Sequence, residues 1–341
     1  MLDLIKEYII KFTDFVCGWP LFTLLIGGGI FLFIYSRALP LRKLGMAVSS
    51  LKMKKKGEGQ VSSFQALMNT ISSTVGMGNI AGVAIALCVG GPGAIFWMWV
   101  SALLGMATKF FEGTLAVMYK GKDDKGVAQG GPMFVLTEGI GRKMKPLAVM
   151  FAFCALFSGL PVMQANQLSE SLYSVILEPL GVPESRWVFL VIGLVIGGIV
   201  SLVIFGGIKR ISQVSSKIVP FMVGFYFLMV VGIMVVYHDR LPSVFEAIFE
   251  GAFCWKAGFG AFTAVALTGA RRAMFVNEAG VGTAGMMHGA SMNAEPVREG
   301  LVAMLGPAID SGLVCTLSAI PMIMAGLYRD RKSTRLNSSH L

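Results

Sequence analysis

Long apolar runs separated by short charged segments are the feature that most limits how this chain can fold. A membrane-spanning helix needs about 20 consecutive apolar residues, whereas a transmembrane barrel strand alternates apolar and polar residues. The runs here are continuous, so the pattern predicts an all-α polytopic membrane protein. Eight runs qualify, at approximately residues 18–36, 62–89, 92–119, 146–176, 187–206, 214–237, 260–290 and 298–327. The third, fourth and seventh are long enough for a tilted or interrupted helix.

The composition argues against a soluble protein. Of the 341 residues, 55% are hydrophobic and 14% are charged, whereas soluble domains are about a quarter charged. The net charge of +10 fits basic loops on the cytoplasmic side of a lipid bilayer. Nucleic-acid binding would require a soluble domain with a basic face, and we expect none. The five cysteines form no CxxC pair and histidines number three, so we predict neither a resident metal site nor a cofactor.

The basic loops set the orientation. Lysines and arginines are dense in 37–56, in 120–145 and around Lys209, whereas the alternate loops 178–186 and 237–242 are poor in them. Basic loops stay in the cytoplasm, so the alternation agrees with the number of spans and places the N-terminus outside. No cleavage site follows the first run, which reads as a retained span. The glycine-rich segment 130–141 is too short to span and predicts an interfacial or re-entrant piece.

A short sequence recurs inside two of the runs. Gly76-Met77-Gly78-Asn79 and Gly280-Val281-Gly282-Thr283 are each followed by Ala-Gly, directly or after one residue, and they lie 204 residues apart. Glycine pairs break a helix and free backbone amides and carbonyls, which can bind a carboxylate and a cation. Five predicted spans occupy 62–237, so a second copy would be inverted, as in inverted-repeat transporters. Close helix packing is the competing explanation. A dinucleotide fingerprint is rejected because no strand precedes the glycines.

The repeat defines the domain organisation. Residues 1–61 would hold an extra N-terminal span and a basic cytoplasmic loop, and 62–237 the first five-helix repeat. Residues 244–328 would start the second, inverted repeat with two helices. We therefore expect about three further helices in a complete repeat. The polar end, 331–341, is unrelated to the span before it and is expected to be a non-native tail.

One motif resembles a known family. Residues 90–105, GGPGAIFWMWVSALLG, resemble the signature of the alanine/glycine:cation symporter family, and the resemblance extends from about residue 15 to 327. Further segments that look like this family are 74–84 (TVGMGNIAGVA), 129–132 (QGGP), 277–282 (NEAGVG) and 296–305 (PVREGLVAML). The resemblance implies Na⁺- or H⁺-driven uptake of alanine or glycine through the cytoplasmic (inner) membrane of a prokaryote. It also implies a leucine-transporter-like inverted repeat of five plus five helices, with 62–89 and 260–290 as the broken helices. Ala273, Val276 and Gly285 depart from the family pattern and leave the substrate preference open.

Polar residues near the two breaks are the candidate site. Amides and charges inside a membrane are costly unless bonded, and ionisable groups there suggest function. We predict pairing of Glu278 with Arg272 and, at helical spacing, of Lys109 with Glu112. Gln164 and Asn166 both lie in the fourth run, where interhelical hydrogen bonding is the alternative role. Helix capping is the alternative for Asn79, and a structural pair is the alternative for Asp310. The predicted substrate-binding residues are Gly76, Gly78, Asn79, Gln164, Gly280, Gly282 and Thr283. The predicted cation or gating residues are Thr74, Asn277, Glu278 and Asp310.

The predicted function is sodium-coupled symport of a small neutral amino acid, alanine or glycine, by alternating access, with Na⁺ as the coupling ion. Alternatives are a carrier of the same fold for another small solute, H⁺ coupling, or a fragment without activity. A channel is disfavoured, because channels favour symmetric pores with charged rings or carbonyl filters. An intramembrane enzyme would need a nucleophile–base or metal constellation, and none stands out in the sequence.

Overall fold

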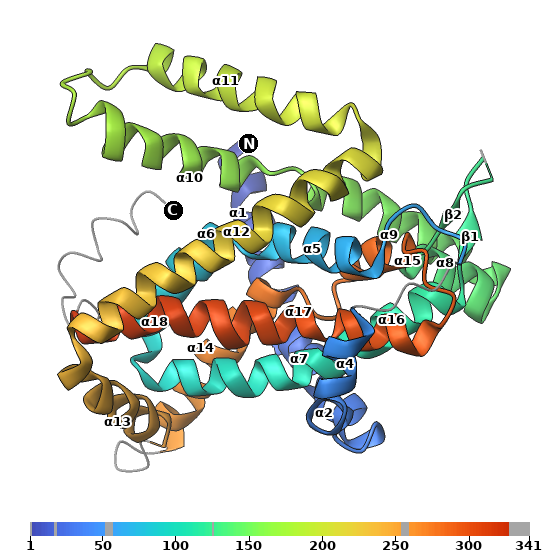
Figure 1. Ribbon diagram of the computed structural model, residues 1–341, viewed down its shortest axis with the longest axis horizontal. Coiled ribbons are helices and arrows are strands. Elements are labelled where there is room, and N and C mark those ends of the chain that lie inside the picture. Colours follow the sequence, from blue (N-terminus) through green and yellow to red (C-terminus); the bar gives the residue numbers. More distant parts are fainter. Residues whose placement is uncertain (1, 17–18, 52–56, 125, 254–258, 327–341) are drawn as a thin grey trace.

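The computed structural model describes residues 2–16, 19–51, 57–124, 126–253 and 259–326. The predicted tail 331–341 lies outside the described residues. Almost all of the described chain is helical, as the apolar runs predict (Figure 1). The N-terminal part consists of α1 (Leu2–Val16), α2 (Trp19–Tyr35), α3 (Leu39–Arg42) and α4 (Leu44–Ser50). Helix α2 coincides with the first predicted run, whereas α1 precedes every predicted run.

The first predicted repeat begins with a bent helix pair. Helix α5 (Ser63–Thr74) starts at a capping box, in which the Ser62 side chain and Gln65 bond reciprocally to each other's backbone N–H. It is followed by α6 (Met77–Gly90), with a 48° bend between the two. The helices after that pair are α7 (Gly93–Met118), α9 (Lys145–Ser158), α10 (Val162–Leu172), α11 (Arg186–Ile204) and α12 (Gly207–Val236). The run 146–176 is therefore interrupted, between α9 and α10.

Segment 130–141, predicted to be interfacial, lies in a short folded insertion between α7 and α9. This insertion holds a two-stranded antiparallel ribbon and short helical turns. Its elements are β1 (Gly121–Lys122), β2 (Ala128–Gln129), α8 (Pro132–Phe134), η1 (Val135–Ile140) and η2 (Arg142–Met144). The π-helical turn η3 (Tyr173–Leu177) continues α10.

The last part contains the second predicted break. Its elements are η4 (His238–Arg240), α13 (Leu241–Ala252), α14 (Phe259–Asn277), α15 (Thr283–Gly289), α16 (Pro296–Ala303), α17 (Leu305–Pro307), η6 (Ala308–Val314) and α18 (Cys315–Met324). Helix α13 lies in a stretch where no span was predicted. It packs against α7 and α18 through Val244, Ile248 and Ala252. Elements α16 to α18 form one nearly continuous rod with a π-helical middle.

Helix α7 is the centre of the bundle. It contacts α16 and α14 most extensively, and also α2, α13 and α15 (Figure 1). The two broken helices, α5–α6 and α14–α15, lie against each other with opposite polarity, because α6 packs on α14 while α5 packs on α15. The buried side chains around these helices form separate clusters, and Ile95 and Met98 of α7 are almost fully enclosed in one of them. The two broken helices pack against α7 and against the α16–α18 rod.

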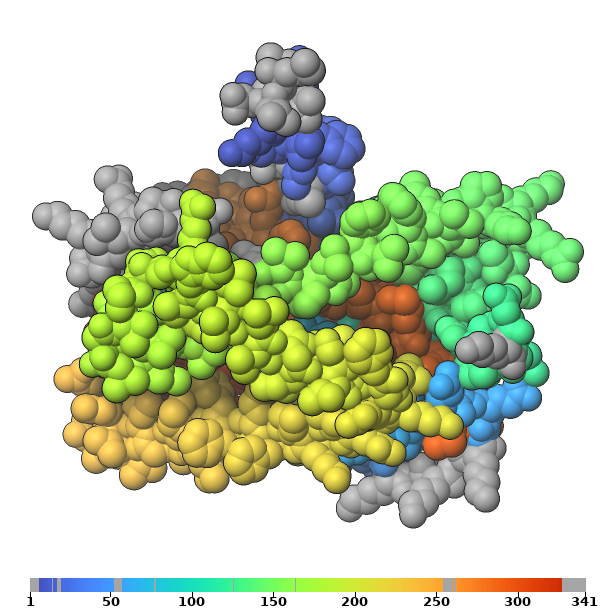
Figure 2. Space-filling view, turned by 90° about the horizontal axis from the view of Figure 1, so that it is seen from above, coloured from blue at the N-terminus to red at the C-terminus, as the bar shows by residue number. Residues whose placement is uncertain are grey.

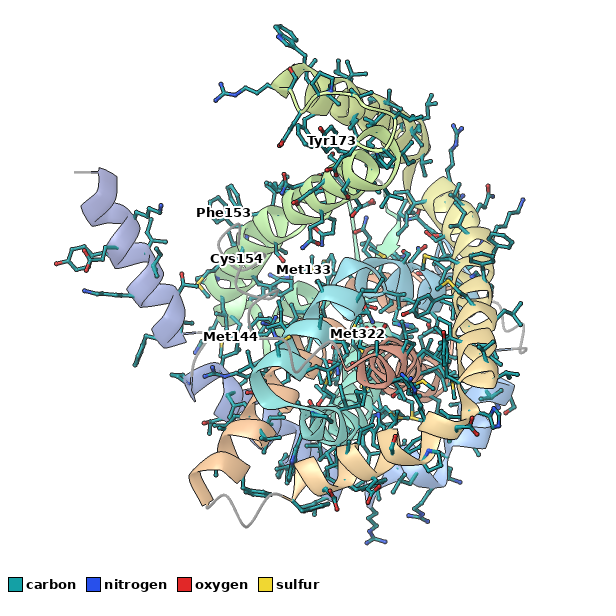
Figure 3. The ribbon with its side chains drawn as sticks, turned by 90° about the vertical axis from the view of Figure 1, so that its left-hand side faces the viewer. Met133, Met144, Phe153, Cys154, Tyr173 and Met322 are labelled. Carbon is teal, nitrogen blue, oxygen red and sulfur yellow. The ribbon has the colours of Figure 1, made fainter. Side chains whose placement is uncertain are left out.

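Several helices are apolar on every side and remain exposed. Helix α11 has no buried residue in its most apolar window, and α12 has 11% of its window buried. Helices α10 and α11 lie over one face of the bundle (Figure 2), and α1 stands apart from the rest (Figure 3). Helices that are apolar all round suit contact with lipid.

Among the described residues, four helices are long and apolar enough to cross a membrane, and the bent pair α5–α6 makes a fifth span if counted as one. The others are Gly93–Met118, Arg186–Ile204, Gly207–Val236 and Pro296–Met324. Helix α2 is shorter, and the runs 146–176 and 260–290 are divided by their breaks. The prediction of an all-α polytopic membrane protein is therefore confirmed.

The close approach of α7 and α13 yields a stability test. A Cβ added to Gly93 would overlap the backbone of Gly251, whereas nothing lies within 4 Å of one added to Gly197 on α11. We expect Gly93→Leu to destabilise the protein by about 1–3 kcal/mol, as overpacking does, and to lower its melting temperature in detergent. Gly197→Leu is the control and should leave it nearly unchanged. Equal melting temperatures for both variants would contradict this packing.

Candidate functional site

The first break is built by glycine and closed by Asn79. Helix α5 ends at Thr74, and Val75 and Gly76 have extended backbone before α6 begins. The Asn79 side-chain oxygen accepts a hydrogen bond from the Gly76 amide at 3.1 Å, which caps the first turn of α6. The side-chain amide of Asn79 donates to the carboxylate of Asp310 on η6. Asn79 is fully buried, so it links the first break to the α16–α18 rod.

The second break runs from Glu278 to Gly282, between α14 and α15. Glu278, Gly280 and Gly282 all have positive φ, of 49°, 86° and 97°, a conformation that glycine adopts readily and other residues rarely. Asn277 accepts from the Ala279 amide at 3.0 Å, and the Thr283 hydroxyl donates to the Glu278 carboxylate at 2.6 Å. Local side chains therefore stabilise this turn.

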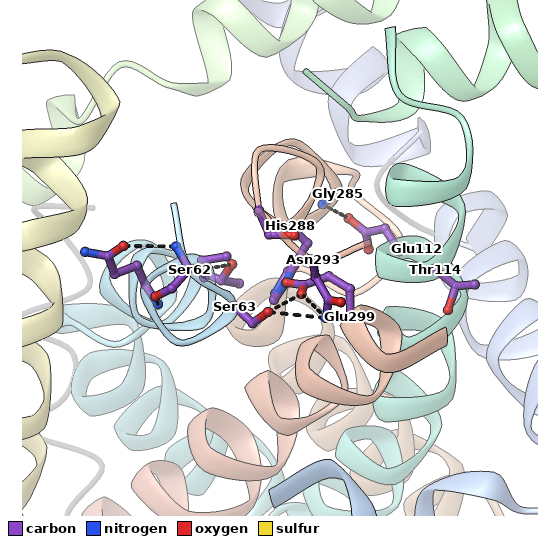
Figure 4. A network of polar contacts seen from close by, with 12 residues as sticks. Ser62, Ser63, Glu112, Thr114, Gly285, His288, Asn293 and Glu299 are labelled. Carbon is purple, nitrogen blue, oxygen red and sulfur yellow. Dashed lines mark hydrogen bonds and ion pairs between the residues drawn. The ribbon is translucent and has the colours of Figure 1, made fainter. Parts of the chain in front are cut away.

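A carboxylate from α7 completes the second break. Glu112 accepts from the Gly285 amide at 2.8 Å (Figure 4). It also accepts from the Gly280 amide at 3.4 Å. A negative charge beside the unpaired amides of a helix start is favourable. Glu112 thus occupies backbone donors that a bound carboxylate would otherwise use. The second break is satisfied from within the protein.

A cavity of about 390 Å³ opens at the first break. Its walls come from the end of α5, the start of α6, the middle of α10 and the end of α14. The lining residues include both charged groups and amides as well as bare backbone. They are Ser73, Thr74, Gly76, Gly78, Ala81, Gly82, Ile85, Gln164, Gln167, Arg272, Phe275, Val276 and Glu278. Such a mixture suits a small polar molecule more than an apolar one.

The structure divides the predicted site residues into three groups. Thr74, Gly76, Gly78, Gln164 and Glu278 come together in the cavity wall. Asn79, Asn277 and Asp310 are buried behind it, at 2% exposure or less. The remaining three lie elsewhere: Gly280 faces Leu25 and Thr108, Gly282 faces Pro132 and Phe151, and Thr283 bonds to Glu278.

Behind the cavity lie buried polar atoms that have no hydrogen-bond partner among the described residues. The second carboxylate oxygen of Asp310, the Lys109 ammonium, the Asn277 side-chain amide nitrogen and the Ser311 hydroxyl make no hydrogen bond to described residues. Lys109 is 1% exposed and acts electrostatically on Asp310. Unpaired polar groups are costly in a low-dielectric interior. These groups could therefore bind a polar or charged ligand.

Two predicted ion pairs are wrong. Lys109 and Glu112 are three residues apart on α7, yet Glu112 bonds to the amides of α15 and the Lys109 ammonium has no hydrogen-bond partner among the described residues. No ion pair joins Arg272 to Glu278 within the described ranges, although both line the cavity. The local spacing misled because the Gly285 and Gly280 amides of the second break donate to Glu112, so its carboxylate is engaged away from the lysine on its own helix.

Sequence reasoning missed Gln167 and Arg272 as residues that line the cavity. It also missed Glu112 as the hydrogen-bond acceptor of the second break. Gln167 lies three residues after Gln164, so helical spacing could have placed both on one face of α10. Glu112 carried a signal too, as a carboxylate inside an apolar run. Its partners are 168 and 173 positions away in the chain, and no local pattern could identify them.

An apolar helical bundle with two broken helices of opposite polarity beside a polar cavity is the architecture expected of a multi-pass membrane carrier. Comparison with known proteins identifies the family: the chain matches the sodium:alanine symporter family over residues 2–340 and belongs to it. Its members are transporters, and the chain is accordingly an amino-acid symporter of the membrane.

Three relatives illustrate the family. The sodium/alanine symporter AgcS of Methanococcus maripaludis is 39% identical, over 92% of this chain and 70% of the relative. The putative sodium/proton-dependent alanine carrier protein YrbD of Bacillus subtilis is 36% identical, over 94% and 65%. The probable sodium/glutamine symporter GlnT of the same species is 32% identical, over 95% and 67%. These names differ in both the solute and the cation.

Removing the Glu112 carboxylate tests its role at the second break. We expect Glu112→Leu to leave the Gly285 and Gly280 amides unpaired and to destabilise the protein by about 1–3 kcal/mol. Thermal unfolding in detergent measures the effect. Glu138→Leu, at an exposed glutamate of η1, is the matched control. The anchoring role is contradicted if the two variants melt at the same temperature.

Proposed function

We propose that the chain carries out sodium-coupled symport of alanine or glycine by alternating access, in the cytoplasmic membrane of a prokaryote. Family membership supports cation-coupled amino-acid transport. The names of AgcS and YrbD both include alanine and sodium, which favours this solute and ion. The observation that carries the proposal is the polar cavity where the first break meets α10 and α14.

The cavity offers complementary groups for a zwitterion. Gly78 lies in its wall within the first turn of α6, where backbone amides lack helical partners and favour a carboxylate. Glu278 lies in the same wall and supplies a negative charge for an ammonium group. Gln164 of α10 can donate and accept on the open side. The substrate therefore binds with its carboxylate toward the start of α6 and its ammonium toward Glu278.

The coupling cation binds behind the first break. Asp310 holds one carboxylate oxygen against Asn79 and leaves the other unpaired, and the Thr74 hydroxyl lies beside it. Broken helices bind Na⁺ through freed carbonyls and the C-terminal ends of half-helices, and α5 ends here. Na⁺ at this point would satisfy the buried carboxylate and draw α5 toward η6. Cation and substrate would thus share the same break.

A second candidate is a carrier of the same fold for a larger neutral amino acid. Liquid water occupies about 30 Å³ per molecule, so a cavity of about 390 Å³ exceeds what the six heavy atoms of alanine fill. Gln167 adds a further amide to the wall, and the name of GlnT includes glutamine. Competition of glutamine against labelled alanine separates the two solutes.

Uptake assays test the proposed function. In cells that express the protein, we expect labelled alanine uptake to require Na⁺ and to fall about tenfold or more in Gln164→Ala, because the variant removes an amide from the cavity wall. Gln213→Ala, at an exposed glutamine of α12, is the control. Uptake that persists when choline replaces Na⁺ would disprove sodium coupling.

Thermal stabilisation by Na⁺ tests the cation site separately. A ligand that binds only the folded state raises its stability with concentration, so Na⁺ should raise the melting temperature of the purified protein. In Asp310→Asn, which keeps the side-chain shape and removes the charge, we expect this rise to disappear. Potassium at equal ionic strength is the control. An undiminished Na⁺-dependent rise in the variant would exclude Asp310 as a ligand.

A further inference from the structure

The start of α5 and the end of α15 are joined by backbone pairing on one side of the bundle. The segment that precedes α5 runs beside the loop that follows α15, with a parallel bridge between Val61 and Ser291. The Gln60 amide donates to the Ala290 carbonyl at 2.8 Å, and the Met292 amide donates to the Val61 carbonyl at 2.7 Å. This end carries the basic loops, so we call it the inner end.

A buried carboxylate reinforces that junction. Glu299, in the first turns of α16, is fully enclosed and accepts three hydrogen bonds (Figure 4). Ser63, the first residue of α5, donates at 2.6 Å, Asn293 donates at 3.1 Å, and His288 of α15 lies at 2.6 Å through Nδ1. The Glu299 side chain therefore bonds to the start of α5, to the end of α15 and to the loop between α15 and α16.

Lys120, just beyond the end of α7, bonds to both sides of this backbone pairing. Its ammonium donates to the Glu58 carbonyl at 2.8 Å and to the Ser291 carbonyl at 2.6 Å, one on each side of the backbone pairing. Burial lowers the pKa of Lys120, while the carboxylates of Glu299 and Glu58 oppose that shift. A Cβ on Gly59 would overlap the Ser291 carbonyl. The inner end is thus closed tightly, by polar contacts.

The cavity lies on the other side of this closure. Its lining comes from the break itself, α10 and the half-helices α6 and α14, whereas the Glu299 contacts involve the far ends of α5 and α15. A carrier that works by alternating access must open each end in turn. The inner end must therefore separate at the junction between α5, α15 and α16 for release.

We propose that Glu299, with Ser63, His288 and Asn293, is the latch that keeps the inner gate closed, and that its release opens the cavity toward the cytoplasm. This inference rests on the proposed function. Hydrogen bonds suit a reversible latch because water replaces them on opening, so each contributes little net free energy. An apolar seal would expose its whole surface to water instead. Glu299 is a positioning residue that acts on α5 and does not touch the substrate.

Accessibility of a cysteine in the cavity tests the latch. The reporter is Ser73→Cys, in the cavity wall. It is introduced into a background in which Cys17, Cys88, Cys154 and Cys254 are replaced by serine. The labelling of that background without the reporter is subtracted. A membrane-impermeant thiol reagent is applied to either side of sealed vesicles, and Lys122→Cys marks the inner side. In Glu299→Gln we expect labelling from the inner side to rise about tenfold and labelling from the outer side to fall. Ser63→Ala should give a smaller shift in the same direction.

Opposite changes on the two sides distinguish a gate from a loosened fold. Glu295→Gln is the matched control, because the Glu295 carboxylate pairs with Arg298 at the surface. This variant should leave the labelling rate unchanged from both the inner and the outer side. Rates that rise on both sides, or that stay unchanged in both Glu299→Gln and Ser63→Ala, would overturn the proposal. Labelling is measured without alanine or Na⁺, so it does not depend on which solute or cation the protein transports. If the uptake prediction fails, the labelling result still tests the latch.

Discussion

The need to satisfy backbone hydrogen bonds inside an apolar bundle is the constraint on which this structure depends. An unpaired amide or carbonyl in a membrane interior costs several kcal/mol, so a helix can be broken only where other groups replace the lost bonds. At the first break the Asn79 side chain bonds to the Gly76 amide. At the second, Glu112 reaches across from α7 to the Gly285 and Gly280 amides. Helix α7, which packs most extensively on α14 and α16, also carries the carboxylate that pairs with the second break.

The two breaks are therefore alike in sequence and unlike in use. Both contain Gly-x-Gly, yet only the first contributes its glycines to the cavity. The glycines of the second take up positive φ and pack against α2, α8 and α9, and its amides are occupied by Glu112. An internal carboxylate occupies the amides of one break, whereas the glycines of the other border the cavity. A strictly symmetric reading of the repeat would place the substrate equally on both.

The sequence allowed the class of fold and the positions of both breaks to be predicted, because continuous apolar runs and glycine pairs are local signals. It also identified Thr74, Gly76, Gly78, Gln164 and Glu278, which the structure gathers in one wall. It failed where partners are distant: Glu112 was paired with Lys109 by helical spacing, and the Glu299 cluster went unnoticed. Ser63 and Glu299 are 236 residues apart, and only the packing of α5 on α15 and α16 brings them together.

Helix α5 connects the cavity to the inner end of the bundle. Its last residue, Thr74, lies in the cavity wall beside Asp310, and its first, Ser63, bonds to Glu299. Twelve helical residues at about 1.5 Å each make a rod about 18 Å long, too stiff to absorb movement at one end only. Under the proposed latch, a cation or solute that binds better in one of two positions of Thr74 would shift the equilibrium of the Ser63 contact. By linkage, a weaker Glu299 contact would in turn alter the affinity at the cavity.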